Sequence, residues 1–405
     1  MSFDVQEFRK SFPQLERKVG PNSLIYFDSA ASTLKHSAVT DRVNTYNRFE
    51  TANVHRGAHQ ASQQGTENYE GARKKVQAFV NAKSDQEIIF TRGTTESINL
   101  ICHGFESKLK PGDEVLISPF EHHSNIVPWQ VLCTKTGASL KVVPFDSKSG
   151  MSIEAFKQAI NENTKIASFI FYSNSFGNRL PVEEMISLCK EKGILTLIDG
   201  AQAVLTEAVD VQSLDCDFFC FSGHKIFAPY GIGALYIKAN HLDNLSPYQT
   251  GGSMIDRVTF EKTTYANSPQ KFEAGTPNIS GAIGLGTAID VLKKLDFKDQ
   301  HAHVVALRNR LVEGLKARSK VEVYEFPSSD YAGVVSFNVQ GSHSSDVGTL
   351  LDKYAVAVRA GHHCTQPLMG LMGIPGTVRV SVAAYNTVEE VDYFLTIMEK
   401  IEEFF

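Results

Sequence analysis

Short apolar runs alternate with longer amphipathic stretches through the middle of the chain. The apolar runs include EVLIS, KIASFIFYS, ILTLID and DFFCFSG, and stretches with helical spacing lie between them, among them NIVPWQVLCTKTG, IEAFKQAIN and VEEMISLCKEKG. Short β-rich runs that are bounded by turn residues and separated by helical periodicity are typical of βα units around a mainly parallel sheet. The pattern therefore predicts an α/β fold for this part of the chain.

The pattern changes after about residue 277. The helical patterns GLGTAIDVLKKLD and HVVALRNRLVEGLKAR precede the strand patterns VEVYEF and AGVVSFNVQ, and then come a helix SDVGTLLDKYA, strands VAVRAG and VRVSVAAY, and a helix VEEVDYFLTIMEKIEEFF. This order predicts a smaller α+β unit. We expect a large domain over 21–280, a small C-terminal domain over 281–405 that carries Cys364, and an N-terminal segment, 1–20, that packs with the small domain.

Composition and charge exclude several classes of protein. The 405 residues include 40 Lys and Arg against 45 Asp and Glu, a net charge of -5, so no overall basic field attracts nucleic acid or anionic lipid. The start, MSFDVQEFRKSFPQLERK, has no apolar core of signal-peptide length, and no later segment approaches the ~18 apolar residues of a membrane span. We expect a cytoplasmic protein that binds neither nucleic acid nor a membrane.

The six cysteines form no C-x-x-C pair, which argues against structural zinc, and a cytoplasmic chain of this size argues against a disulfide framework. In LDCDFFCFSG, strand alternation predicts that Cys216 and Cys220 share one face beside Phe218. Five cysteines are expected to be core side chains: Cys102, Cys133, Cys189, Cys216 and Cys220. Only Cys364 has polar and cationic neighbours in the sequence.

The stretch RAGHHCTQP, Arg359 to Pro367, places two histidines beside Cys364. Imidazole and thiolate bind metals, and a cation beside a thiol makes that thiol reactive. Three adjacent ligands on a strand or loop point in different directions and have no fourth ligand nearby, so a metal carrier is disfavoured and we expect no metal. A nucleophilic role for Cys364 is the alternative, with Arg359, and His362 or His363 if protonated, as sources of positive charge.

Lys225 in SGHKIFAPYGIG follows an apolar strand. Burying an ammonium group costs several kcal/mol unless its charge is neutralised or its pKa falls, and a Schiff base with pyridoxal phosphate is one solution. A strand-end lysine that reaches solvent is the other interpretation. Asp199, at the end of ILTLID, is either a partner for the nitrogen of a pyridine ring or a helix N-cap.

Three further strings offer ligand contacts or ordinary turns. In RGTTESINL, Gly93, Thr94 and Thr95 precede a helical run and form either a phosphate cradle or an imperfect capping box. In EHHSNIVPW, an imidazole could stack on a pyridine ring or be structural. NVHRGAH, with His55, and FEAGTPN, with Thr276, could supply anion contacts or be turns.

Taken together and in this order, these strings resemble cysteine desulfurases of the second group, which belong to the pyridoxal-phosphate (PLP) enzymes of fold type I and the class V aminotransferases. The matching strings run from about residue 26 to about residue 386: YFDSAAS, NVHRGAHQ, RGTTESINL, EHHSNIVPW, DGAQAV, DVQSLDCDFFCFSGHK, GIGALY, FEAGTPN and VRAGHHCTQP. The resemblance implies a large domain with a mainly parallel seven-stranded sheet flanked by helices and a smaller α+β C-terminal domain.

The resemblance also implies the site. Lys225 would carry the PLP Schiff base and move a proton, His122 would stack on the ring and Cys364 would accept the sulfur. The other expected cofactor contacts are Thr94, Thr95, Asn174, Asp199, Gln202, Ser222, His224 and, from a second subunit, Thr276. The expected substrate contacts are His55, Asn174, Arg359 and Arg379.

The implied activity is removal of sulfur from L-cysteine, which gives L-alanine and an enzyme persulfide for iron–sulfur cluster assembly or another sulfur-transfer pathway. The expected partners are a second copy of the chain, in a homodimer, and a sulfur acceptor of the SufE or CsdE kind. A selenocysteine lyase acting on L-selenocysteine, an aminotransferase and a kynureninase are alternatives in the same fold.

The chain departs from the family's usual pattern in several places. Thr206 stands where a histidine is common, Phe227 and Ala228 replace the tyrosine and glycine of HKLYGP, and Thr365 stands where alanine often follows the cysteine. None of these residues replaces a group with a direct chemical task, so we expect the same type of reaction.

Overall fold

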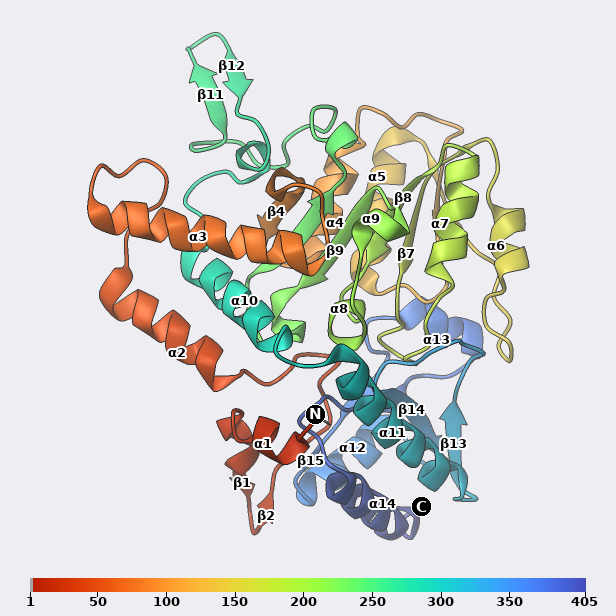
Figure 1. The fold of residues 1–405 in the computed structure, drawn as a ribbon. Coiled ribbons are helices and arrows are strands. Elements are labelled where there is room, and N and C mark those ends of the chain that lie inside the picture. Colours follow the sequence, from red (N-terminus) through yellow and green to blue (C-terminus); the bar gives the residue numbers. More distant parts are fainter. Residues whose placement is uncertain (1–2) are drawn as a thin grey trace.

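The computed structural model describes residues 3–405 and has a seven-stranded sheet at the centre of the larger of two units (Figure 1). The strand order is β4-β10-β9-β8-β7-β5-β6. β10 is antiparallel to β4 and β9, and all other neighbours are parallel. The strands are β4 Ile88–Thr91, β5 Glu114–Ile117, β6 Ser139–Val142, β7 Thr164–Ile170, β8 Leu195–Asp199, β9 Phe218–Ser222 and β10 Gly233–Ile237. The predicted α/β fold with a mainly parallel sheet is confirmed.

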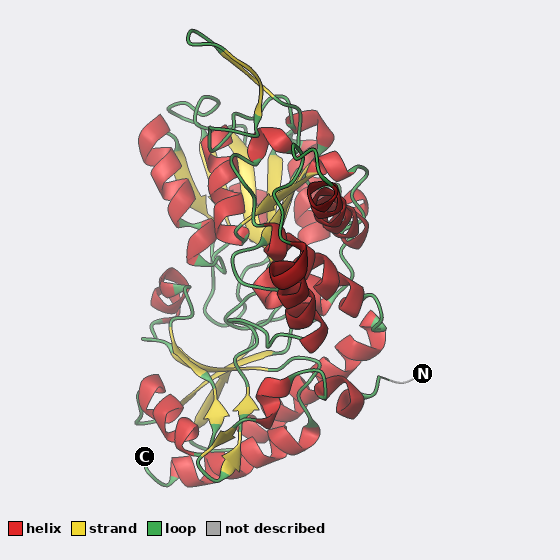
Figure 2. Cartoon of the chain, turned by 90° about the vertical axis from the view of Figure 1, so that its left-hand side faces the viewer, coloured by secondary structure: helices red, strands yellow, loops and turns green. Residues whose placement is uncertain are grey.

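Helices cover both faces of this sheet (Figure 2). Side chains alternate along the strands: Cys220 of β9 packs with α4 and α5, whereas Phe219 and Phe221 pack with α3, α7 and α10. The helices of this unit are α2 Ser37–Thr45, α3 Gln60–Phe79, α4 Thr94–Gly104, α5 Val127–Thr136, α6 Ile153–Ala159, α7 Val182–Glu191, α8 Ala203–Thr206, α9 Val211–Leu214 and α10 Ile279–Leu292. The hairpin β11 Ile255–Val258 and β12 Thr263–Tyr265 projects from this unit (Figure 1).

Five cysteines are buried, as predicted, and Cys364 is exposed. The prediction that Cys216 and Cys220 share a strand face was wrong. β9 begins at Phe218, so the alternation does not extend back to Cys216. Cys216 packs in the same cluster as Phe219 and Phe221, on the opposite side of the sheet from Cys220.

The smaller unit has a four-stranded sheet of order β13-β14-β17-β16 and its own hydrophobic core. Its strands are β13 Val321–Tyr324, β14 Val334–Val339, β16 Arg359–Gly361 and β17 Thr377–Ser381, and its helices are α11 Phe297–Lys316, α12 Ser344–Lys353, α13 Gln366–Met372 and α14 Val388–Glu402. The single strand predicted over VAVRAG is two strands. β15 Val356–Ala357 pairs in parallel with β3 Ile25–Tyr26, and β16 then pairs with β17, so the chain changes partner at Val358.

The helix α10 follows the expected domain boundary but packs against α2 and α3 of the larger unit. We therefore propose that the boundary falls after Leu292. The N-terminal helix α1 Val5–Arg9 contacts the small unit, because the Arg9 guanidinium donates to Glu390 at 2.8 Å. This contact supports the expected packing of segment 1–20. The short strand β1 Lys18–Val19 lies in this segment and pairs with β2 Asn22–Ser23, which follows it.

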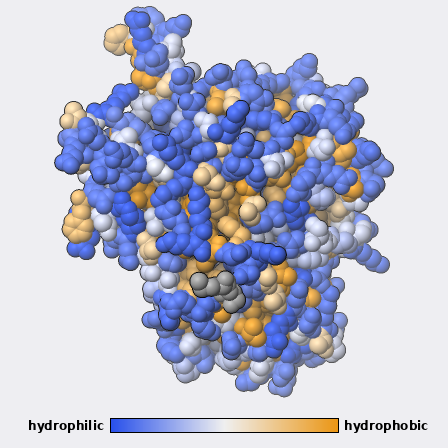
Figure 3. Space-filling model, viewed as in Figure 1, coloured by the Kyte–Doolittle hydropathy of each residue, from blue (hydrophilic) through white to orange (hydrophobic). Residues whose placement is uncertain are grey.

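Most of the surface on the face shown in Figure 3 is hydrophilic, and hydrophobic side chains gather near the junction of the two units. Within residues 3–405, none of the helices combines the length and apolar character needed to cross a bilayer.

Candidate active site

A cavity of about 320 Å³ lies where loops after the parallel strands meet the small unit. Ligands in open α/β sheets collect beyond the carboxyl ends of the strands, so this position is typical of a binding site. The polar and titratable side chains that line it are Thr94, Thr95, His122, Ser124, Asn174, Asp199, Ser222, His224, Lys225, Arg359, His363, Cys364 and Arg379. One cavity thus brings together most of the residues singled out in the sequence.

Lys225 lies in the short helical turn that directly follows β9. Burial lowers the pKa of its amine below the ordinary 10.5, and the nearby Arg379 acts in the same direction, while Asp199 acts against it. A lowered pKa increases the neutral fraction of the amine, which is the form that attacks a carbonyl or accepts a proton.

Asp199 ends β8 and is 2% exposed. Its Oδ1 accepts the backbone N–H of Ala201 at 2.9 Å, and the N-cap of α8 is Gln202, so Asp199 is not a helix cap. Burial raises the pKa of this carboxyl above 3.8, and the charge of Lys225 opposes the shift. Gln202 donates to the Ala30 carbonyl at 2.8 Å and is not among the residues that line the cavity.

The N-terminus of α4 opens onto the cavity. The helix begins at Thr94, so the expectation that Thr94 and Thr95 precede it was wrong by two residues. Its N-cap residue is Gly93, so no side chain caps the first turn of the helix. A larger residue would crowd this position, because a Cβ on Gly93 would lie 2.9 Å from Ser222 Oγ. Helix N-termini attract anions through free N–H groups and the helix dipole. The cradle therefore fits a phosphate group, and His224 Nδ1 is buried beside it with no partner within residues 3–405.

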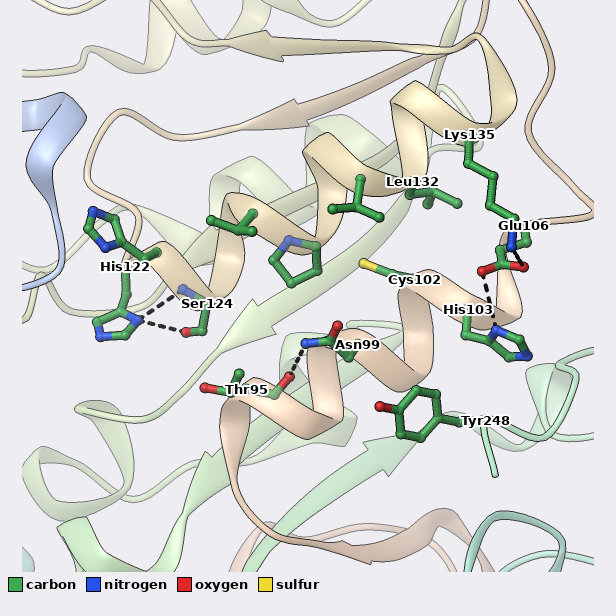
Figure 4. Close-up of a pocket in the computed structure, with 14 residues that line it drawn as sticks. Thr95, Asn99, Cys102, His103, Glu106, His122, Ser124, Leu132, Lys135 and Tyr248 are labelled. Atoms are coloured by element: carbon green, nitrogen blue, oxygen red, sulfur yellow. Dashed lines mark hydrogen bonds and ion pairs between the residues drawn. The ribbon is translucent and has the colours of Figure 1, made fainter. Parts of the chain in front are cut away.

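The ring of His122 is held by Ser124, as Figure 4 shows. His122 Nδ1 accepts the Ser124 backbone N–H at 3.1 Å and lies 2.7 Å from Ser124 Oγ. A nitrogen that accepts a hydrogen bond carries no proton, so the proton of the neutral ring is on Nε2. Burial, with the charge of Lys225, lowers the pKa of His122 to about 3.

Because of this low pKa, we expect His122 to stay neutral from about pH 5 to about 8, where ordinary histidines change charge. The measurement is the ring nitrogen signals of ¹⁵N-labelled protein across this range, with His122→Gln used to assign the signal. A midpoint near ~6.5, the ordinary histidine value, would contradict the expectation.

Two arginines share one carboxylate. Asp28 accepts from Arg359 at 3.0 and 2.8 Å and from Arg379 Nη2 at 3.2 Å, and the two arginines face each other across β16 and β17. Arg379 is 2% exposed, and its Nη1 donates to the Asn174 carbonyl at 2.8 Å. Burial lowers the pKa of Arg379 to about 10. The Nε of Arg379 has no partner in the described part of the chain, so a donor remains for an anionic ligand.

The sequence predicted no role for Asp28, although this residue lies in the matching string YFDSAAS. An acidic residue two positions after the strand β3 was the available signal. Its charge partners lie more than three hundred residues later, so only the fold reveals the pairing.

Cys364 lines the cavity from a loop between β16 and α13. Burial lowers the pKa of its neighbour His363 to about 2, and Arg379 and Arg359 act in the same direction. The expectation that a protonated His363 could activate the thiol is therefore wrong. Arg359 and Arg379, which line the same cavity, are nearby sources of positive charge.

Two predicted residues lie away from the cavity within one chain. His55 Nε2 contacts Glu70 at 2.8 Å, and Thr276 is exposed on the loop before α10. Neither lines the cavity. The assignment of Thr276 to the site of a second subunit stays a prediction, as does the substrate contact of His55.

A groove of about 460 Å³ lies beside the cavity, between α4 and α5, and shares Thr95, His122 and Ser124 with it (Figure 4). The groove contains neither Lys225 nor the two arginines, so the smaller cavity is the candidate active site. Within residues 3–405, no group of three or more His, Cys, Asp and Glu side chains is arranged to hold a metal ion.

Known proteins similar to this chain identify its family and a subgroup within that family. The aminotransferase class-V family matches residues 25–394, and the chain belongs to this family. A protein of Escherichia coli O127:H6 named cysteine desulfurase is 43% identical over 403 residues, which covers 99% of each chain. Within the family, the chain therefore groups with the cysteine desulfurases.

Two solved structures of cysteine desulfurases support this grouping. The apo cysteine desulfurase of Thermococcus onnurineus NA1 has a TM-score of 0.94 and 37% identity, over 99% of this chain and 98% of that one. The cysteine desulfurase CsdA of Escherichia coli has a TM-score of 0.93 and 36% identity over the full length of both chains. The fold is that of type I PLP enzymes, and the chain is a PLP-dependent enzyme.

Proposed function

We propose that the protein removes sulfur from L-cysteine, releases L-alanine and retains the sulfur as a persulfide on Cys364. The observation that carries this proposal is that Lys225 and Cys364 line one cavity. An aminotransferase or a kynureninase has no use for a thiol at this position, whereas a desulfurase needs a nucleophile that can reach the substrate sulfur.

The residues around the cavity fit the cofactor. The N-terminus of α4, with Ser222 and His224, is suited to the phosphate, Asp199 to the ring nitrogen and Lys225 to the covalent link. When bound, PLP acts as an electron sink for the substrate carbon and makes the substrate sulfur electrophilic. Neutral His122 can pack on the ring without placing a second charge beside Lys225.

The arginines are suited to the substrate carboxylate. Arg379 is held by Asp28 and by the Asn174 carbonyl, and its buried Nε has no partner within residues 3–405, so the guanidinium keeps a donor for an anion. Arg359 lies next to it and is held by the same carboxylate. A substrate fixed in this way presents its Cα to Lys225 and its sulfur to Cys364.

The two reactive side chains then have separate tasks. The neutral amine of Lys225 takes the Cα proton and returns a proton to the carbon product. The thiolate of Cys364 forms an S–S bond with the substrate sulfur as the substrate Cβ–S bond breaks, and the carbon product leaves as alanine.

Changing Arg379 to lysine is expected to raise KM for L-cysteine by about tenfold to a hundredfold and to change kcat less. A lysine keeps the charge but loses the planar fork that makes charge-assisted hydrogen bonds in fixed directions. Steady-state kinetics measure the effect, and Arg310→Lys, which changes an exposed ion pair with Asp392, is the matched control. A fall in kcat with unchanged KM would contradict the assignment.

We also propose that the enzyme is a homodimer in which Thr276 contacts the phosphate bound by the other subunit. Thr276 is exposed and so is available for such a contact. We propose a cytoplasmic location and delivery of the sulfur to an acceptor protein of the SufE or CsdE kind, for iron–sulfur cluster assembly. The exposed Cys364 supports transfer to another protein.

The experiment that tests the activity is incubation of the purified, PLP-loaded protein with L-cysteine and a thiol reductant. We expect yellow protein that forms alanine and sulfide in equal amounts. Colourless protein that forms neither product after PLP is added would contradict the proposal.

A further inference from the structure

We propose that the hydroxyl group of Thr365 positions the Cys364 thiol by fastening its loop to the large unit. The inference rests on the proposed function of Cys364 as the sulfur acceptor. Thr365 is fully buried, although it follows an exposed cysteine. Its Oγ1 donates to the His362 carbonyl at 2.9 Å and lies 2.7 Å from Ser175 Oγ.

The direction of these bonds follows from the number of protons. The single hydroxyl proton of Thr365 is used on the His362 carbonyl, because a carbonyl only accepts. Ser175 Oγ must therefore donate to Thr365 Oγ1. The chain Ser175 to Thr365 to His362 thus links the large unit to the residue two positions before Cys364.

An ordinary structural role does not explain this hydroxyl. Thr365 is the N-cap of α13, and threonine at an N-cap usually accepts a hydrogen bond from the first turn of its helix. Here it makes no side-chain cap, and the hydroxyl points instead to the cysteine loop and to Ser175.

Two further hydrogen bonds hold the backbone of this loop against the large unit. The His363 carbonyl accepts from Asn174 Nδ2 at 2.8 Å, and the Cys364 carbonyl accepts from the His123 backbone N–H at 2.7 Å. His363 and Cys364 have φ angles of 49° and 58°, in the left-handed region that non-glycine residues seldom occupy. Such a conformation persists only where surrounding contacts hold it, so each anchor contributes to the direction of the thiol.

The anchors also connect the thiol to the substrate-binding arginine. Asn174 accepts from Arg379 through its carbonyl and donates to the loop through its side chain, and the next residue, Ser175, contacts Thr365. Two adjacent residues of the large unit therefore set the spacing between the carboxylate-binding group and the nucleophile. Misplacing a reacting atom by a small distance lowers the rate strongly, even when the substrate still binds.

The test compares Thr365→Val, which keeps the shape but removes the hydroxyl, with Thr365→Ser, which keeps the hydroxyl. We expect Thr365→Val to lower kcat for L-cysteine by roughly tenfold with little change in KM. Ser175→Ala should act in the same direction, and Thr365→Ser should restore most of the rate. Thr349→Val, on an exposed face of α12, is the matched control and should leave kcat unchanged.

A second readout does not depend on turnover. The amide hydrogens of 363–366 are expected to exchange at least about tenfold faster in Thr365→Val, while amides in the core strand β17 keep their protection. If wild-type protein forms no alanine, the proposed activity fails, and the exchange measurement still tests the anchor. Unchanged exchange and kcat in Thr365→Val, or an equal loss of kcat in Thr365→Ser, would overturn the positioning role.

Discussion

Changing Cys364 to alanine is expected to lower alanine formation from L-cysteine by at least about a hundredfold while PLP remains bound, because the nucleophile that breaks the Cβ–S bond is lost. The side chain lies on the loop before α13, whereas we assign the phosphate to the N-terminus of α4. The measurement is the initial rate of alanine formation together with the visible absorbance of the protein.

The matched control is Cys364→Ser, which keeps the size of the side chain and replaces the thiol by a much weaker nucleophile. It should be as inactive as the alanine variant. L-selenocysteine tests the alternative activity, because selenium leaves more easily and depends less on the thiol. A Cys364→Ala variant that formed alanine from L-cysteine at the wild-type rate would contradict the assigned role.

Changing Lys225 to alanine is expected to reduce turnover by about a thousandfold or more, because the amine both links the cofactor and moves the Cα proton. Its pKa is lowered by burial, and its position after β9 places it beside Asp199 and Arg379. The measurements are the rate of alanine formation and the absorbance of the covalently linked cofactor.

The absorbance separates loss of the link from loss of folding. Lys225→Ala should lose the covalent absorbance and keep the circular dichroism of the wild type. Lys148→Ala, at an exposed turn, should change neither. Retention of both turnover and covalent absorbance in Lys225→Ala would show that another residue links the cofactor.

The sheet could be predicted because each central strand is a short apolar run, and the site could be predicted because its residues follow those runs. Asp199 ends β8, and Lys225 lies in the turn after the neighbouring parallel strand β9, so the sheet brings them together. The same reasoning cannot find Asp28, whose two arginine partners are distant in the sequence. It also misjudged Cys216, because strand alternation applies only from the residue at which the strand begins.

The charge state of His363 and the contacts between subunits could not be predicted from the sequence either. The string HHC gives no sign that His363 is buried beside two arginines and therefore stays neutral. Thr365 could not be interpreted from the sequence because its partner, Ser175, belongs to another unit of the fold. The expected role of Thr276 requires a second chain, whose position does not follow from the residues of one.

The most direct test of the central claim is the mass of the peptide that carries Cys364 after a short incubation of PLP-loaded enzyme with L-cysteine and no reductant. Our account predicts one additional sulfur atom on Cys364, removable by reductant, and one alanine released for each sulfur retained. Alanine formed in that amount while Cys364 stays unmodified, or sulfur found on another residue, would contradict it.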